Sequence, residues 1–88
     1  MEVIEIENNG YQIRPNPVTD FAKIYFDNND KHQHQLFIYN LNGILLFSST
    51  TQVAFFEVNF ENFHSGIYLF KICTQTNLQK ATGKLVIQ

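Results

Sequence analysis

Short runs of β-branched and aromatic residues recur along this chain, each broken by Asn, Asp, Gly or Pro, and helical periodicity is hard to find. Within the runs, apolar and polar residues tend to alternate, which is typical of strands that place one face against a core. The turn-forming residues recur about every ten positions, which favours about seven short strands over a few long ones. The sequence therefore predicts an all-β protein built as a small sandwich.

The turn signals set the expected bounds of the strands. The segment 11–14 is expected to be extended, because Pro15 disfavours the helical region for Arg14. The stiff bend at Pro15-Asn16-Pro17 then ends this strand. Asn42-Gly43 between apolar runs predicts a tight hairpin in which both residues tolerate positive φ. We expect 48–52 and 76–81 to be polar connections. Further strands are expected at 22–26, 35–40, 44–47, 53–60, 67–74 and 83–87.

Alternation also predicts which side chains face the core. In the strand at 35–40, Leu36 and Ile38 point inward and Phe37 and Tyr39 point outward. Phe63 is expected to plug the core from the loop at 61–65. The strand at 22–26 presents Ala22, Ile24 and Phe26 on one face.

Length and composition fit a single β domain with a compact core. The chain has 88 residues, of which 44% are hydrophobic, with nine Phe and four Tyr. We assign 11–88 to the domain, and 1–10 to a linker or an extra N-terminal strand that includes 3–6. The single Cys73 cannot form an internal disulfide.

Charge and hydropathy exclude two classes of partner. The net charge is −2 and the six Lys and Arg residues are scattered, whereas nucleic-acid binding needs them clustered. No apolar stretch approaches the roughly 20 residues of a membrane helix. Residues 1–7 are acidic at the start and lack the apolar run of a secretory signal, so we expect either a cytoplasmic protein or the tail of a longer precursor with an upstream signal.

The histidines and the cysteine are the first candidates for chemistry. His32 and His34 share a face if they lie on a strand, and a metal would need a third ligand such as His64 or Asp30. The sequence Lys-His-Gln-His-Gln is better explained as a solvated loop. Cys73 with His64 would make a nucleophile pair, but an unpaired Cys in a β run usually packs as a small apolar group.

Other residue patterns give no catalytic site. The carboxylates lie mostly at predicted turns and strand edges, and the four glycines are too widely spaced for a phosphate loop. We therefore expect no catalytic residue, no metal and no cofactor. The carboxylates in question are Asp20, Asp27, Asp30, Glu57 and Glu61.

Aromatic residues offer a second functional reading, because an exposed aromatic face stacks on sugar rings. More aromatics are present than one face of a small sandwich can hold, so some either form a glycan-binding platform or pack on the second sheet. We favour packing. The residues are Phe37, Tyr39, Phe47, Phe55 or Phe56, and Tyr68.

Three short signatures stand in a fixed order along the chain. They are YQIRPNPVTD from Tyr11 to Asp20, FHSGIYLFK from Phe63 to Lys71 and TGKLVIQ from Thr82 to Gln88, with LFIYNLNG from Leu36 to Gly43 between the first two. In this order and position they resemble the type A C-terminal sorting domain of the type IX secretion system (Por secretion system) of Bacteroidetes. The resemblance covers roughly 11–88.

The resemblance implies an Ig-like β-sandwich of about seven antiparallel strands that acts as a non-catalytic export signal. It implies an upstream cargo in the same precursor, folding of the domain in the periplasm, and recognition by an outer-membrane translocon and its shuttle protein. A sortase-like cysteine protease would then cut in or before 1–10, leaving cargo at the cell surface or in the medium.

Two groups of site residues are carried over from the family. The C-terminal end carries much of the export signal, which assigns translocon recognition to Lys84, Leu85, Val86, Ile87 and Gln88. The other motif residues are expected to act mainly through the fold, with Tyr68 tying its hydroxyl to the backbone. They are Pro15, Asn16, Pro17, Gly43, Gly66, Ile67 and Tyr68.

Two other functions remain open at the level of the sequence. One is a carbohydrate-binding or adhesive β-sandwich module of a surface protein, which would bind glycan through an aromatic patch. The other is a free-standing protein that pairs through its exposed strand edges.

Overall fold

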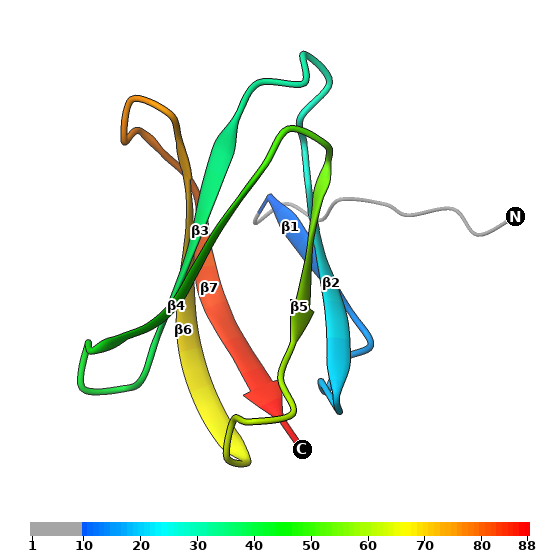
Figure 1. Ribbon diagram of the computed structural model, residues 1–88, viewed down its shortest axis with the longest axis vertical. Coiled ribbons are helices and arrows are strands. Elements are labelled where there is room, and N and C mark those ends of the chain that lie inside the picture. The colour runs from blue at the N-terminus through cyan, green and yellow to red at the C-terminus, as the bar shows by residue number, and fades with distance from the viewer. Residues whose placement is uncertain (1–9) are drawn as a thin grey trace, which may run out of the picture.

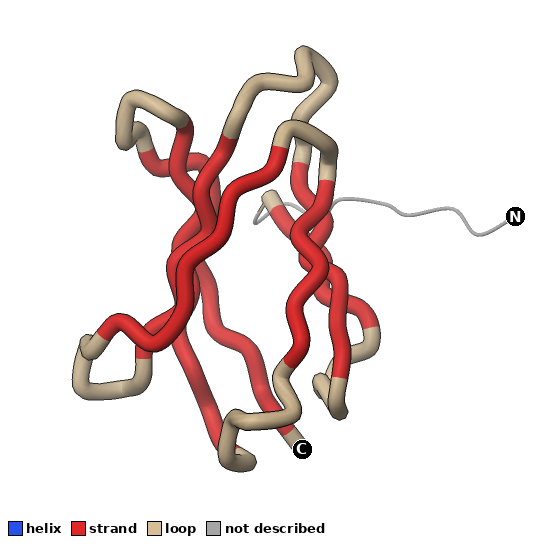
Figure 2. The backbone as a smooth tube through the Cα atoms, in the orientation of Figure 1, coloured by secondary structure: helices blue, strands red, loops and turns tan. Residues whose placement is uncertain are grey.

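A computed structural model describes residues 10–88, and within them every regular element is a β-strand (Figures 1 and 2). The expected strand at 3–6 lies outside the described residues. The seven strands are β1 (Tyr11–Arg14), β2 (Phe21–Phe26), β3 (His34–Tyr39), β4 (Leu45–Thr51), β5 (Phe55–Asn59), β6 (Gly66–Thr74) and β7 (Gln79–Ile87).

The strands form two antiparallel sheets that face each other as layers (Figure 1). Sheet A has the order β1-β2-β5, and sheet B has the order β4-β3-β6-β7. The chain passes from one sheet to the other after β2, β4 and β5. This arrangement confirms the small all-β sandwich of seven antiparallel strands.

The core fills the space between the sheets, and strand alternation accounts for it. Leu36 and Ile38 of β3 are completely buried, while Phe37 and Tyr39 point away from the core, as expected. Phe63 packs on the core from the β5–β6 loop, which confirms its predicted role. The largest buried side chains are those of Phe26, Phe60, Phe70, Ile24, Leu36, Ile38, Ile72 and Leu85.

Two strands extend four residues beyond their predicted bounds. β4 runs to Thr51, so the polar connection expected at 48–52 is wrong: Ser48 and Thr50 pair with β3. β7 begins at Gln79, four residues before its predicted start. In both cases hydrogen bonding to a neighbouring strand extends the element through polar residues, because an outward position needs no apolar side chain.

The β3–β4 hairpin forms where the sequence places it, but with a different turn. Only Gly43 has positive φ, at 84°, and the Asn40 side chain accepts hydrogen bonds from the N–H groups of Asn42 (2.9 Å) and Ile44 (3.0 Å). Asn42 does not use the positive φ that it tolerates, because capping by Asn40 makes a longer loop in which one glycine suffices.

Tyr11 joins the two sheets along one side of the sandwich. Its ring meets the edge of the Phe70 ring at a centroid distance of 4.7 Å and lies directly over Gly83, where a Cβ would overlap it. Gly83 therefore allows sheet A to approach the edge strand β7 closely.

Candidate functional site

The first and last signature segments meet at one end of the sandwich, which we call the signature end. Val18 in the β1–β2 loop donates its N–H to the carbonyl of Val86 (2.8 Å), and Gln88 donates its N–H to the carbonyl of Val18 (2.8 Å). Val18 thereby forms a parallel bridge to Ile87. The C-terminus lies close to the ends of strands from both sheets (Figure 1).

The signature around Tyr68 builds the rest of this end. The Tyr68 hydroxyl donates to the carbonyl of His64 (2.6 Å), as predicted, and the Phe63 ring sits edge-on between those of Phe60 (5.1 Å) and Tyr68 (5.3 Å). Phe60 donates its N–H to the carbonyl of Asp20 (2.7 Å). Segments that are far apart in the sequence are therefore tied together here.

The remaining motif residues shape the backbone of the same region. Pro15, Asn16 and Pro17 are exposed, both prolyl bonds are cis, and the loop ends by turning Val18 into the core. Gly66 enters β6 with φ at 150°, which L side chains rarely adopt. Gly43 lies in the β3–β4 hairpin, which extends from the signature end of sheet B (Figure 1).

The last strand divides its side chains between the core and the surface. Leu85 and Ile87 are 1% and 4% exposed, whereas Lys84, Val86 and Gln88 are exposed. Of the five residues expected to be recognised, two therefore face the core. Only the alternate residues are accessible to a partner when the domain is folded.

The accessible residues of β7 lie beside those of β6 on the outer face of sheet B. Val86 pairs with Ile67, and Lys84 pairs with Leu69. Leu69 and Lys71 were not singled out from the sequence. The alternation in GIYLFK, with Tyr68 and Phe70 inward, is the signal that places them beside Ile67.

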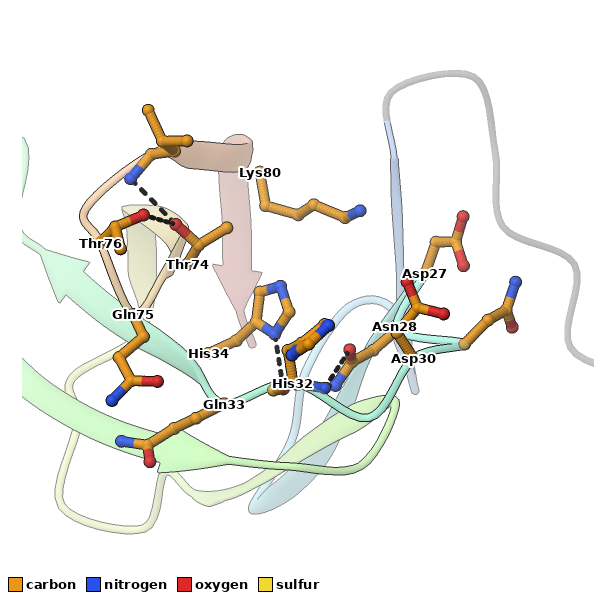
Figure 3. Close-up of a pocket in the computed structure, with 12 residues that line it drawn as sticks. Asp27, Asn28, Asp30, His32, Gln33, His34, Thr74, Gln75, Thr76 and Lys80 are labelled. Atoms are coloured by element: carbon orange, nitrogen blue, oxygen red, sulfur yellow. Dashed lines mark hydrogen bonds between the residues drawn. The ribbon is translucent and has the colours of Figure 1, made fainter.

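The other end of the sandwich holds a polar pocket of about 520 Å³ (Figure 3). It lies between the β2–β3 loop and the β6–β7 hairpin, and we call this the pocket end. Asn28 is buried there, and its amide donates to the carbonyls of His32 (2.9 Å), Gln52 (3.3 Å) and Val53 (3.0 Å). Its Oδ1 accepts from the N–H of His32 (3.1 Å).

The histidines are distributed over both ends. His34 is buried in the pocket wall, and its Nδ1 donates to the carbonyl of His32 (2.9 Å), while the His32 side chain is exposed. His64 lies in the β5–β6 loop at the signature end, away from both. Across 10–88, the structure shows no group of three or more His, Cys, Asp or Glu arranged to hold a metal.

The hypothetical pair of Cys73 and His64 is not brought together. Cys73 lies near the last residue of β6 and His64 just before its first, so the strand separates them by about 20 Å at roughly 3.3 Å per residue. Cys73 is a buried free thiol, as expected of a cysteine that packs as an apolar group.

The aromatic residues are spread over three environments and form no single platform. Phe37 and Tyr39 lie on the outer face of sheet B, and Phe55 lies on the outer face of sheet A beside Tyr25 (5.7 Å). The others face the interior: Phe56 and Tyr68 are buried and Phe47 packs partly buried against the core.

Comparison with known families gives one match over nearly the whole chain. The model of the family described as "Secretion system C-terminal sorting domain" matches residues 12–88. A search of curated proteins found none that matches. Within the described residues, the structure contains no helix with the length and apolar character needed to span a membrane.

Proposed function

Because this chain belongs to the family of secretion system C-terminal sorting domains, the sorting signals of type IX secretion in Bacteroidetes, we propose that it directs an upstream cargo protein across the outer membrane. The observation that carries the proposal is the family match over 12–88. Members of this family are not known as catalysts. The convergence of the three signature segments, 11–20, 63–71 and 82–88, on one end supports a common purpose for them.

The proposed route has four steps. The cargo crosses the inner membrane with its own signal, the domain folds in the periplasm, and the outer-membrane translocon and its shuttle protein recognise it. A sortase-like cysteine protease then cuts in or before 1–10, and the cargo is anchored at the surface or released. The domain is the substrate of that protease.

Within the last five residues, we assign different roles to alternate positions. Lys84, Val86 and Gln88 are the residues that a translocon component contacts directly. Leu85 and Ile87 act by anchoring the strand that presents them. The motif residues from Pro15 to Pro17 and from Gly66 to Tyr68 hold the end in shape.

An export assay tests the proposed function. The chain is fused to the C-terminus of a fluorescent reporter that carries a signal peptide, and is expressed in a Bacteroidetes host with an intact or a disrupted type IX translocon. We expect surface or medium reporter only in the intact host, shortened if cleavage occurs. Periplasmic retention of a folded reporter in the intact host, where a native cargo is exported, would refute the proposal.

Deletion of 84–88 is a poor test on its own. It removes Leu85 and Ile87 from the core together with both hydrogen bonds to Val18, so loss of export would report loss of folding as well. Substitutions at the exposed positions of β7 separate the two effects.

A further inference from the structure

The outer face of sheet B carries an apolar surface with two lysines that form no ion pair with any residue that the structure describes. We propose that this surface docks on a protein of the export machinery whose complementary surface is apolar and bears carboxylates. The proposal rests on the proposed function and specifies the chemistry of its partner. The outer strip, as we name the surface, consists of Tyr39, Leu45, Ile67, Leu69 and Val86, with Lys71 and Lys84.

Strand register makes the outer strip continuous. Tyr39 pairs with Leu45 of β4 on one side and with Leu69 of β6 on the other, and Leu69 pairs in turn with Lys84 of β7. Residues that are directly paired across antiparallel strands share a face, with their Cβ atoms about 5 Å apart. The strip therefore crosses all four strands, and the Ile67–Val86 pair extends it toward the signature end.

The apolar side chains of the strip are open to solvent. Ile67 is 46% exposed, Leu69 is 40% exposed and Val86 is 39% exposed. Scattered exposed apolar residues are normal on a soluble protein, but contiguous ones mark interaction sites. Here they are contiguous, and all three lie within the signatures of the sorting domain.

The charge on this face has one sign. The four strands of sheet B contain no Asp or Glu, and Lys71 and Lys84 form no ion pair with any of the described residues. The Nζ of Lys71 lies 5.6 Å from the Phe37 ring centroid and 5.8 Å from that of Tyr39, which holds the ammonium group over the strip. A partner that covers these lysines must supply carboxylates, since burial of an unpaired charge is costly.

A second copy of the chain is a poorer occupant than an acidic partner. A symmetric dimer through the strip would bring two lysines of one copy against two of the other, with no carboxylate on either face. Like charges placed opposite each other across an interface are strongly unfavourable.

The outer face of sheet A provides an internal control. There Lys23 lies 4.0 Å from a carboxylate oxygen of Glu57 and 4.9 Å from the Phe55 ring centroid, so its charge already has a partner within the domain. A charge reversal on this face changes the net charge as much as one on sheet B, but leaves the strip intact.

The test compares charge variants of the two faces in the reporter fusion. We expect Lys71→Glu with Lys84→Glu to lower export by about tenfold or more, the size of one lost charge-pair coupling at an interface. The double variant Lys71→Arg with Lys84→Arg keeps both charges and should be exported as well as wild type. Lys23→Glu should leave export within about twofold of wild type. Thermal melting of each purified fusion shows whether the variant domain is folded.

Each outcome decides the proposal. If the wild-type fusion is exported and the folded double Glu variant is exported equally well, the docking surface is wrong while the sorting function stands. If the wild-type fusion is not exported, both fail. A concentration-dependent dimer in sedimentation that Ile67→Asp abolishes would assign the strip to a second copy and overturn the acidic partner. A photo-crosslinker at Val86 should capture an outer-membrane protein at an acidic, apolar segment, whereas one at Tyr25 should not.

Discussion

The two ends of the sandwich differ in the hydrogen bonds that contribute most to joining distant segments. At the signature end, backbone groups of distant segments bond to one another, as in the two hydrogen bonds that join Val18 to Val86 and Gln88. At the pocket end, the side chain of Asn28 bonds to the backbone at 32 and at 52–53. The backbone hydrogen bonds form whenever the chain follows this path, whichever side chains it carries. The hydrogen bonds of Asn28 require the side-chain amide at that one position. A family signature can therefore reflect the path of the backbone as well as the identity of functional side chains.

The largest effect is expected from breaking the signature end at its core. Leu85→Ala should lower the free energy of unfolding by about 3 kcal/mol, because it leaves a cavity at a site that is 1% exposed. Chemical denaturation of the isolated chain measures it. Val86→Ala on the same strand serves as the control, and equal losses for the two would show that β7 does not divide its side chains between core and surface.

Asn28→Ala removes the side chain that joins the segments of the pocket end, and should lower the free energy of unfolding by about 2 kcal/mol. The substitution removes the donor to three part-buried carbonyls. An unsatisfied buried polar group costs about 1–3 kcal/mol, and solvent that reaches these carbonyls offsets part of this penalty. Denaturation of Asn28→Ala beside Asn29→Ala, whose side chain is exposed, measures the difference. A loss no greater than that of Asn29→Ala would mean that the pocket end does not depend on this amide.

Tyr68→Phe measures how much a side-chain hydrogen bond contributes to stability at the signature end. We expect a loss of about 1 kcal/mol, because only the hydrogen bond to the His64 carbonyl disappears while the ring packing remains. The melting temperature should fall by a few degrees. If Tyr68→Phe lowers the free energy of unfolding more than Asn28→Ala does, side-chain hydrogen bonds matter more at the signature end than at the pocket end.

The smallest change in stability is expected on the outward side of β7. Lys84→Glu should change the free energy of unfolding by less than about 0.5 kcal/mol, since Lys84 is exposed and forms no ion pair within the described residues. Export of the fusion should nevertheless fall. Unchanged export with unchanged stability would leave Lys84 without a role in recognition.

Sequence patterns predicted most of the fold because its elements follow local rules. Alternation placed Leu36 and Ile38 in the core, and the signatures located the segments that meet at the signature end. The extent of β4 was not predictable from local composition, because its polar half, 48–51, is held in the sheet by pairing with β3. Asn28 also gave no signal beyond that of a turn residue, since its partners at 52 and 53 are distant in sequence.

The sequence pointed to a segment as the proposed recognition site, but not to which of its side chains are accessible. The motif pointed to the last five residues as a block, and only the two-sheet packing distinguishes Leu85 and Ile87 from their exposed neighbours. Lys71 belongs to the proposed docking surface because it pairs with Phe37, which depends on how β3 pairs with β6. Sequence alone gives the period of a strand but not which strands lie side by side.

The bridge between Val18 and Gln88 has a consequence for the order of folding. It closes a chain loop of about 70 residues, and the entropy lost in closing a loop grows with its length. Such contacts form slowly compared with hairpins, which close within a few residues. Local hairpins such as β3–β4 therefore assemble ahead of this bridge, and the end that gathers the signatures is completed late. A receptor that reads this end, as we propose, would detect a finished domain, so the proposed recognition residues would also report that the protein has folded.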